Sequence, residues 1–283
     1  MTEPGAARVA VYLDFDNIVI SRYDQVNGRN SFQREKAKGL EAAKLARARV
    51  DVGAILDFAS SFGTVVLTRA YADWSADVNA EYREQLVGRA VDLVQLFPAA
   101  AYGKNAADIR LAVDAVEDMF RLPDLTHVVI VAGDSDYIPL AQRCKRLGRY
   151  VVGIGVAGSS SRSLAAACDE FVIYDSLPGV PVAEPATAEE PATRTKRTKS
   201  AEAEAPDPQA AATALLKRAL QIGLDKDDVD WLHNSAVKAQ MKRMDPSFSE
   251  KALGFKSFSD FLRSRTDVVE LDESSTTRMV KLR

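Results

Sequence analysis

The stretch VVIVAGDSDYIPL (residues 128–140) has the pattern of a buried β-strand followed by acidic residues and a helix. Its first five residues are apolar and mostly β-branched, which predicts a strand that stops at Gly133. Asp134 and Asp136 follow at once, and Pro139 stands near the start of the next helix. In a chain of alternating strands and helices, such acids lie at the carboxyl edge of a parallel sheet, where open α/β sheets bind ligands. Two carboxylates at this edge can hold a hard cation such as Mg²⁺.

Composition and charge limit the classes of protein to which the chain can belong. Its 283 residues favour two domains, at roughly 150 residues per domain. The 47% apolar and 27% charged content is that of an ordinary globular protein. A formal net charge of −3 excludes a strongly basic nucleic-acid binder, so any nucleic-acid contact must come from local patches.

Cysteine usage and targeting patterns predict a cytoplasmic protein. Cys144 and Cys168 show no CxxC spacing, so we expect buried thiols in a reducing compartment. The amino-terminal apolar run is too short, and its flanks too acidic, for a signal peptide. No run of about 18 apolar residues is present, so we expect no membrane span and no membrane partner.

Five further apolar runs predict strands that alternate with helices. The strands are expected at residues 9–13, 64–70, 91–96, 150–154 and 170–174, and the helices at 38–61, 76–88, 104–120, after 139 to 146, and 161–167. Residues 21–36 are polar and predict an exposed loop with a turn at Asn27-Gly28. Strand–helix alternation predicts an α/β fold, a parallel sheet with helices on both faces.

Four carboxylates are candidates for one catalytic and metal-binding site: Asp14, Asp108, Asp134 and Asp136. Asp14 directly follows the first strand, and Asp108 lies in the first turn of the helix 104–120. The carboxyl ends of parallel strands meet at one edge, so these acids can converge on Mg²⁺ or Mn²⁺. A phosphodiester hydrolase uses such an ion to polarise the phosphoryl oxygen and to lower the pKa of the attacking water. Asn17 and Ser135, beside these acids, are candidate substrate-binding residues.

The helix 104–120 carries further candidates. Ile109, Val113, Val116 and Phe120 form one apolar stripe at helical spacing, typical of an amphipathic helix. Lys104 precedes Asp108 by one turn and could contact a substrate phosphate. Asp114 points about 120° away from Asp108, so we expect it to support the site from behind or to pair with Arg110.

Two other interpretations of the acids remain open. Strand-end Asp residues can simply cap the helices that follow. DFDN (14–17), with GDSD later, also resembles the acid pairs of haloacid-dehalogenase-like phosphatases, in which the first Asp would be a nucleophile and the second a general acid. That family continues its first motif with Gly-Thr, where this chain has Asn17-Ile18, and its further acid after the later Gly-Asp is missing here.

Four motifs taken together resemble the NYN domain, in the PIN-like nuclease group that includes LabA-like bacterial proteins. They are YLDFDNI (12–18), KNAADIRLAVDAV (104–116), VVIVAGDSDYIPL (128–140) and RSLAAACDEFVIYD (162–175). The resemblance covers about residues 7–176 and implies a PIN-like three-layer fold and a metal-dependent ribonuclease. The family's acidic site falls on Asp14, Asp108, Asp134 and Asp136, with Asn17 beside them, and Asp114 fits its recurring second acid.

The rest of the chain predicts a linker and a second domain. Residues 177–208 are rich in Pro, Ala and Glu without apolar periodicity, which predicts a disordered linker. Residues 209–283 predict three helices and a hairpin, a small winged helix-turn-helix. LLKRALQ (215–221) and GFKSFSDFL (254–262) resemble the OST-HTH or LOTUS domain, which implies RNA binding, with some members favouring G-rich RNA, or a protein partner.

The preferred hypothesis is a metal-dependent endoribonuclease whose carboxyl-terminal domain engages RNA, G-rich or structured RNA being one possibility. A non-catalytic RNA-binding or regulatory protein is the alternative, followed by the phosphatase.

Overall fold

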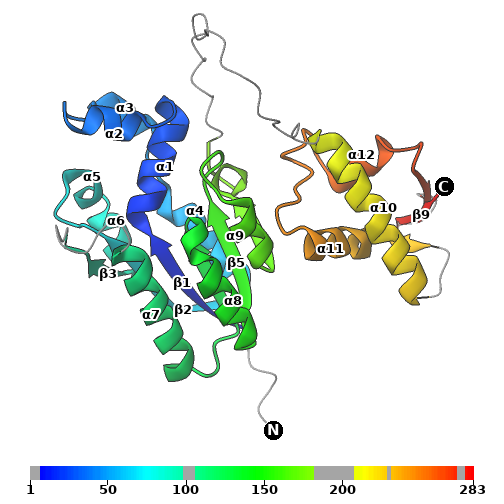
Figure 1. Cartoon of the computed structure of the whole chain (residues 1–283), viewed down its shortest axis with the longest axis horizontal. Helices are drawn as coiled ribbons and strands as arrows, with labels where there is room; N and C mark the ends of the chain where they lie inside the picture. Colours follow the sequence, from blue (N-terminus) through cyan, green and yellow to red (C-terminus); the bar gives the residue numbers. More distant parts are fainter. Residues whose placement is uncertain (1–6, 98–105, 182–206, 228–230, 273–277) are drawn as a thin grey trace, which may run out of the picture. The chain divides into compact units, whose positions relative to one another are not determined.

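The computed structural model describes residues 7–97, 106–181, 207–227, 231–272 and 278–283. The chain divides into two compact units, Met1–Ala188 and Glu189–Arg283 (Figure 1). The predicted disordered linker, residues 177–208, lies mostly outside the described residues. No helix in the described ranges is long and apolar enough to cross a membrane.

The first unit is organised on one parallel sheet. Within the described residues its strands lie in the order β3-β2-β1-β4-β5-β6. Their bounds are β1 Arg8–Asp14, β2 Thr64–Ala72, β3 Asp92–Gln95, β4 His127–Val131, β5 Tyr150–Gly155 and β6 Glu170–Ile173. All neighbouring pairs are parallel, as the strand–helix alternation predicted. The strand order reverses direction between β1 and β4, which makes their carboxyl ends the switch point where such sheets bind ligands.

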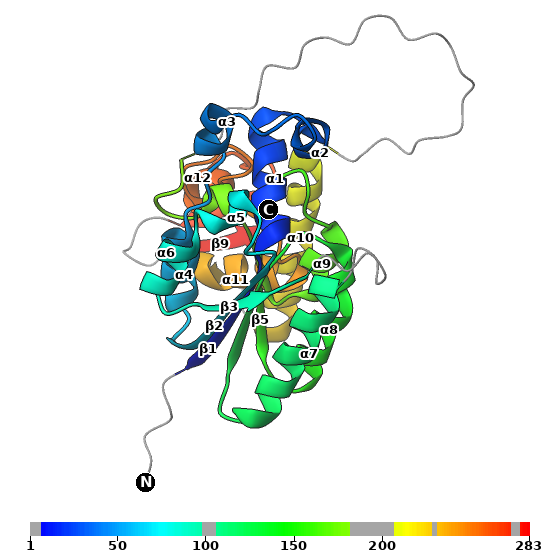
Figure 2. The same cartoon turned by 90° about the vertical axis from the view of Figure 1, so that its left-hand side faces the viewer.

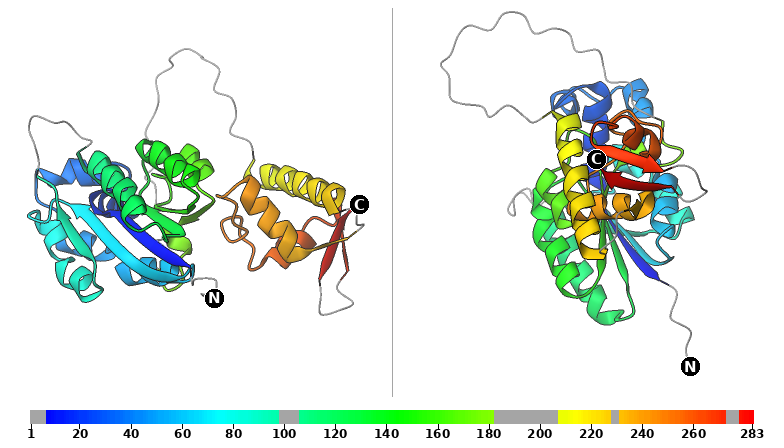
Figure 3. Two further views of the ribbon diagram at one scale, coloured as in Figure 1. Left: turned by 90° about the horizontal axis from the view of Figure 1, so that it is seen from below. Right: turned by 90° about the vertical axis from the view of Figure 1, so that its right-hand side faces the viewer.

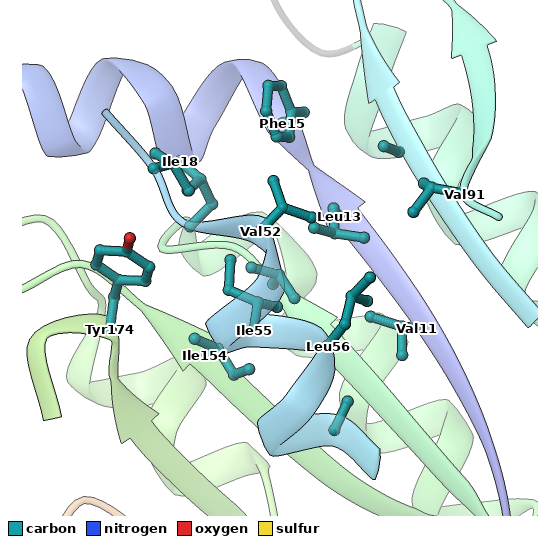
Figure 4. Close-up of a cluster of buried hydrophobic side chains, with 14 of the residues drawn as sticks. Val11, Leu13, Phe15, Ile18, Val52, Ile55, Leu56, Val91, Ile154 and Tyr174 are labelled. Carbon is teal, nitrogen blue, oxygen red and sulfur yellow. The ribbon is translucent and has the colours of Figure 1, made fainter. Parts of the chain in front are cut away.

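Helices cover both faces of this sheet, which gives the predicted three layers (Figures 1 and 2). On one face, α1 (Phe15–Asn27), α4 (Val52–Ser60) and α6 (Arg83–Gly88) contribute to a core that includes Val11 and Leu13 of β1. Figure 4 shows Leu56 of α4 beside Val11 and Val52 of α4 beside Leu13. On the other face, α7 (Ala106–Arg121), α8 (Ile138–Arg146) and α9 (Arg162–Ala167) pack on Ala10 and Tyr12. Successive residues of β1 therefore serve opposite faces, as the pleat of a strand requires.

The prediction of an exposed loop at residues 21–36 is wrong, because this segment is mostly helical. It contains the end of α1 and all of α2 (Ser31–Lys36), joined by the expected turn at Gly28, whose φ is 101°. Tyr23 packs edge-on against Phe32, and its hydroxyl donates to Glu35 at 2.7 Å. Buried Arg22 pairs with Asp175. The polar residues that suggested a loop are thus largely used in contacts between helices.

Two predicted helices are each divided. Residues 38–61 form α3 (Ala42–Arg47) and α4, and residues 76–88 form α5 (Asp77–Ala80) and α6. The first division has a clear cause, because the Asp51 side chain accepts from Ala54 N at 3.0 Å and starts a new helix. The apolar period alone does not register such a cap.

The predicted apolar stripe of α7 exists, but it faces solvent. Ile109, Val113 and Phe120 are 64%, 56% and 65% exposed. The side that packs on the sheet carries Leu111, Ala115 and Met119, and also two buried acids, Asp114 and Asp118. Asp114 accepts from Tyr71 and Arg110, and Asp118 from Tyr12 and Arg69. These partners satisfy the two carboxylates and so allow them to lie on the buried face of α7.

The second unit has three helices and a small antiparallel sheet in its described part (Figure 3). The elements are α10 (Pro208–Asp227), β7 (Leu232–His233), α11 (Asn234–Met244), α12 (Phe258–Arg263), β8 (Val269–Asp272) and β9 (Met279–Leu282). The predicted hairpin is β8–β9, and the Ser257 side chain caps α12. Helix α11 follows directly after Leu232 and His233, which join the sheet. Phe258 and Phe261 are buried in the core.

Candidate functional site

Asp14 is the last residue of β1 and lies at the switch point of the sheet. Its side chain, 4% exposed, accepts hydrogen bonds from Asn17 N at 3.2 Å and from the Tyr137 hydroxyl at 2.9 Å. The first of these caps α1. Burial raises the pKa of Asp14 to about 7, the two hydrogen bonds oppose that rise, and the charge of Asp108 adds to it. Asp14 therefore changes charge near neutral pH in the absence of a cation.

Asp134 and Asp136 follow β4 and are exposed. Asp134 Oδ1 accepts from Asp136 N at 3.2 Å and from the Ser135 hydroxyl at 3.3 Å, which caps the short helix η1 (Ser135–Tyr137). The capping interpretation is thus correct for Asp14 and Asp134. A cap uses only part of a carboxylate's acceptor capacity, so it leaves oxygen lone pairs for a cation.

Asp108 lies in the first turn of α7 and is half-buried. Burial raises its pKa most, and the charges of Asp134 and Asp136 raise it further. Hydrogen bonds with Tyr137 and with Asp14 act in the opposite direction. The four candidate acids therefore interact with one another, although Asp108 comes from a different element than the rest.

Tyr137 is a site residue that the sequence analysis missed. It is buried, and its hydroxyl donates to Asp14 at 2.9 Å, while the charge of Asp108 also acts on it. Burial and the two nearby carboxylates raise the pKa of Tyr137, so its phenol stays protonated. It is thus a fixed donor to Asp14 at the site of the acids. Its position directly after GDSD, at the start of a helix, was the available signal.

The remaining candidates occupy different places. Asn17 Oδ1 accepts from Gly133 N at 3.2 Å and so joins the end of β1 to the end of β4. Asp114 pairs with Arg110 at 2.9 Å, which confirms the predicted i, i+4 ion pair. Lys104 lies outside the described residues.

Asp16, the second acid of the first motif, supports a neighbouring loop. Its carboxylate accepts from Asp73 N at 3.2 Å and from the side-chain amide of Asn79, after the end of β2. The phosphatase interpretation needs a general acid at this position, presented to substrate. Because Asp16 is engaged with the loop, this geometry disfavours that interpretation.

The donors at the site fit a hard divalent ion. No three acidic, His or Cys side chains within the described residues already form a metal cage. Mg²⁺ does not require one, because it is often held by one or two carboxylates while waters and substrate phosphates complete its shell. In the same ranges, no Lys or Arg forms an ion pair with Asp14, Asp108 or Asp134. A cation is therefore the charge that this group of acids would accept.

The first unit is a three-layer α/β domain, with one parallel sheet between two layers of helices. Interacting acids lie at the switch point of this sheet, as in PIN-like domains. The chain belongs to the NYN domain family, whose model matches residues 8–175. This is a PIN-like nuclease family. The OST-HTH/LOTUS domain model matches residues 204–280.

Two individual proteins are similar to this chain. An uncharacterized protein of Methanocaldococcus jannaschii is 28% identical over 123 residues, which cover 44% of this chain. The match spans about half of that relative, 47% of its length. The crystal structure of a protein of unknown function from Vibrio parahaemolyticus matches with a TM-score of 0.47 and 22% identity, over 62% of this chain and 98% of that one.

Proposed function

We propose that the chain is a metal-dependent endoribonuclease that hydrolyses RNA phosphodiester bonds at the carboxyl ends of β1 and β4. The observation that carries this proposal is the buried Asp14 carboxylate, which Tyr137 and Asn17 hold in place and whose pKa the charge of Asp108 raises. The charges of the exposed Asp134 and Asp136 in turn raise the pKa of Asp108, so the four acids act on one another at the end of β1 and β4. Membership of the NYN family supports nuclease chemistry, and the OST-HTH/LOTUS match supports RNA as the substrate.

The four acids would share the binding of Mg²⁺ or Mn²⁺ unequally. Asp14 is buried and fixed by two hydrogen bonds, so it would determine how far below the protein surface the ion binds. Asp134 and Asp136 are exposed and would meet the ion from the side on which substrate arrives. When bound, such an ion polarises a phosphoryl oxygen and lowers the pKa of the attacking water. Asp108, half-buried between these groups, would complete the negative surface.

Three residues are proposed to bind the substrate backbone. Asn17 uses its Oδ1 on Gly133, and within the described residues its Nδ2 donates no hydrogen bond, so it can donate to a phosphate oxygen. Ser135 is exposed beside Asp134 and offers a hydroxyl. Lys104 is proposed from its spacing to Asp108 alone. Asp114, bonded to Tyr71 and Arg110, would support α7 from behind.

The OST-HTH/LOTUS unit has fewer available cations than its composition suggests. Lys238 pairs with Glu250, Arg263 pairs with Asp260, and Arg265 lies over the Phe261 ring. Lys251 and Lys256 are exposed and are the cations that we propose for the RNA backbone. A preference for G-rich or structured RNA, or a protein partner for this unit, is a further proposal from the family resemblance.

Cleavage of labelled RNA with Mg²⁺ or Mn²⁺ tests the nuclease proposal. We expect Asp134→Asn to lower the rate by roughly a hundredfold or more, because a metal-facing charge is removed. Asp92→Asn is the matched control, since it makes the same change at an exposed acid of β3. Equal cleavage by wild type and Asp134→Asn would contradict the proposal.

A non-catalytic RNA-binding protein is the second candidate, and the OST-HTH/LOTUS match is the observation that favours it. It predicts undiminished RNA binding with no turnover under any divalent metal. Phosphate trapped on Asp14 during turnover of a phosphomonoester would instead support the phosphatase interpretation.

A further inference from the structure

The solvent side of α7 carries a continuous apolar surface. Ile109, Val113 and Phe120 are more than half exposed. Val116 lies in the same row but is half-buried, because it also packs against the core beneath α7. At 100° per residue, the centre of this row lies about 150° from the centre of the sheet-facing side. Large apolar residues gathered on one exposed face mark an interaction site more often than a random surface.

The spacing of this row indicates what kind of surface would cover it. Steps of four, three and four residues from Ile109 to Phe120 are the a and d positions of a heptad, the seam by which one helix packs against another. No Lys or Arg interrupts the row itself, so it lacks the charges that would hold a nucleic acid. The spacing therefore favours a helix as the partner.

Charges beside the seam indicate which helix. Arg110 and Glu117 are exposed and occupy the two e positions. When two copies of α7 pair antiparallel, the e positions of both helices lie side by side. Arg110 of each copy then lies near Glu117 of the other, and Val113 lies opposite Val116. A helix with this pattern is complementary to itself under a two-fold rotation.

We propose that a second copy of this chain covers the seam, and that α7 pairs antiparallel with α7 in a two-fold dimer. Arg110 already pairs with Asp114, and Glu117 with Arg121, so the contacts between copies would extend existing ion pairs. One helix of 16 residues offers a small interface, well below the roughly 800 Å² per partner of a stable complex. The dimer is therefore weak and forms with increasing concentration.

Sedimentation of the full chain over a concentration series tests the proposal. We expect the wild-type mass to rise towards that of a dimer. Val113→Glu should weaken association roughly a hundredfold, because it buries an unpaired charge in the seam. Val87→Glu is the matched control, since Val87 is 62% exposed on α6, and it should associate like wild type. Circular dichroism confirms that both variants are folded.

A wild-type monomer at every concentration, or a Val113→Glu variant that dimerises like wild type, would overturn the proposal. The first outcome would leave the seam to a helix of a different protein.

Cysteine cross-linking tests the direction of pairing. The antiparallel arrangement places Ile109 opposite Phe120, so mixing Ile109→Cys with Phe120→Cys should give a disulfide between the two kinds of chain under mild oxidation. Each variant alone should remain largely uncoupled, since the native Cys144 and Cys168 are buried. Coupling of Ile109→Cys to itself, without coupling in the mixture, would contradict antiparallel pairing.

Discussion

The two Asp-x-Asp motifs of the sheet have the same spacing but different environments. Asp14-Phe15-Asp16 follows β1, and Asp134-Ser135-Asp136 follows β4. In the first, Phe15 is fully buried against Trp74 and Tyr82, which holds the motif inside the fold. In the second, Ser135 is exposed and the acids on both sides reach solvent.

The residue between the acids therefore sets how deep each carboxylate lies. A buried middle residue makes Asp14 an internal group with a raised pKa and directs Asp16 to the adjoining loop. An exposed middle residue leaves Asp134 and Asp136 where a substrate can reach them. The two motifs thus have equal spacing but different roles. The first places a buried carboxylate inside the site, and the second presents exposed carboxylates to a ligand.

The largest expected difference between the motifs is in stability without metal. A pKa raised from the ordinary 3.8 to about 7 corresponds to about 4 kcal/mol against the ionised Asp14 in the folded state. Asp14→Asn removes that charge, so we expect the free energy of unfolding at about pH 8 with EDTA to rise by roughly 2–4 kcal/mol. Asp134→Asn should change it by less than about 0.5 kcal/mol. Urea unfolding measures both, and a destabilised Asp14→Asn variant would refute the comparison.

The pH dependence of stability should also distinguish the buried Asp14 from the exposed acids of the second motif. A raised folded-state pKa means that the folded protein holds the proton more tightly. This contribution is complete below about pH 4 and is lost as the pH rises through about 7. Calorimetry with EDTA between about pH 5 and 8 should therefore show a steeper loss of Tm for wild type than for Asp14→Asn. Parallel curves of Tm against pH for wild type and Asp14→Asn would contradict a raised pKa of Asp14.

A smaller effect is expected from the second acid of each motif. Asp16→Ala removes the acceptor of Asp73 N and one of the two acceptors of the buried Asn79 amide, which should cost about 1–3 kcal/mol of unfolding free energy. Asp136→Ala changes an exposed side chain, so we expect it to cost less than Asp16→Ala. Chemical denaturation of the two variants side by side provides the measurement. Equal losses would show that the motifs do not differ in this respect.

The smallest effect concerns the phenol that connects the motifs. The Tyr137 hydrogen bonds lower the pKa of Asp14 and of Asp108, so Tyr137→Phe should raise both. Fewer ionised carboxylates at neutral pH should weaken Mn²⁺ binding by roughly three- to tenfold near pH 7, and by less near pH 9. Calorimetric titration at both pH values measures this, with Tyr150→Phe as the control. The same loss at both values would point to a purely structural role.

Sequence patterns predicted the sheet and the strand-end acids because both depend on short-range signals. Apolar β-branched runs such as 128–132 mark buried strands, and Asp14 and Asp134 directly follow such runs. Parallel strands then bring the two acids to one edge without further information. Tyr137 stands directly after GDSD in the chain, but its hydrogen bond to Asp14 depends on packing between distant elements, which these short-range signals do not show.

Helices were harder to predict for a related reason. The helical spacing of apolar residues shows that α7 has one apolar side. It does not show whether that side packs on the sheet or faces solvent. Asp114 and Asp118 could be assigned to the buried face only by knowing that Tyr71 and Tyr12 donate to them from β2 and β1. In α1 and α2, Arg22 and Glu35 looked like loop residues because their partners, Asp175 and Tyr23, were not identified from sequence.

The shortness of β3 has a consequence for solubility. Among the described strands, β3 pairs with β2 only from Arg69 onward, so Thr64–Thr68 has no neighbour on that side. A sheet edge with Val-Val-Leu at residues 65–67 is the kind that recruits other strands into aggregates. Charged Asp57, Arg89 and Asp92 line the groove of about 450 Å³ beside it and oppose such recruitment. Neutralising these charges should therefore increase light scattering on mild heating while leaving the carboxylate site intact.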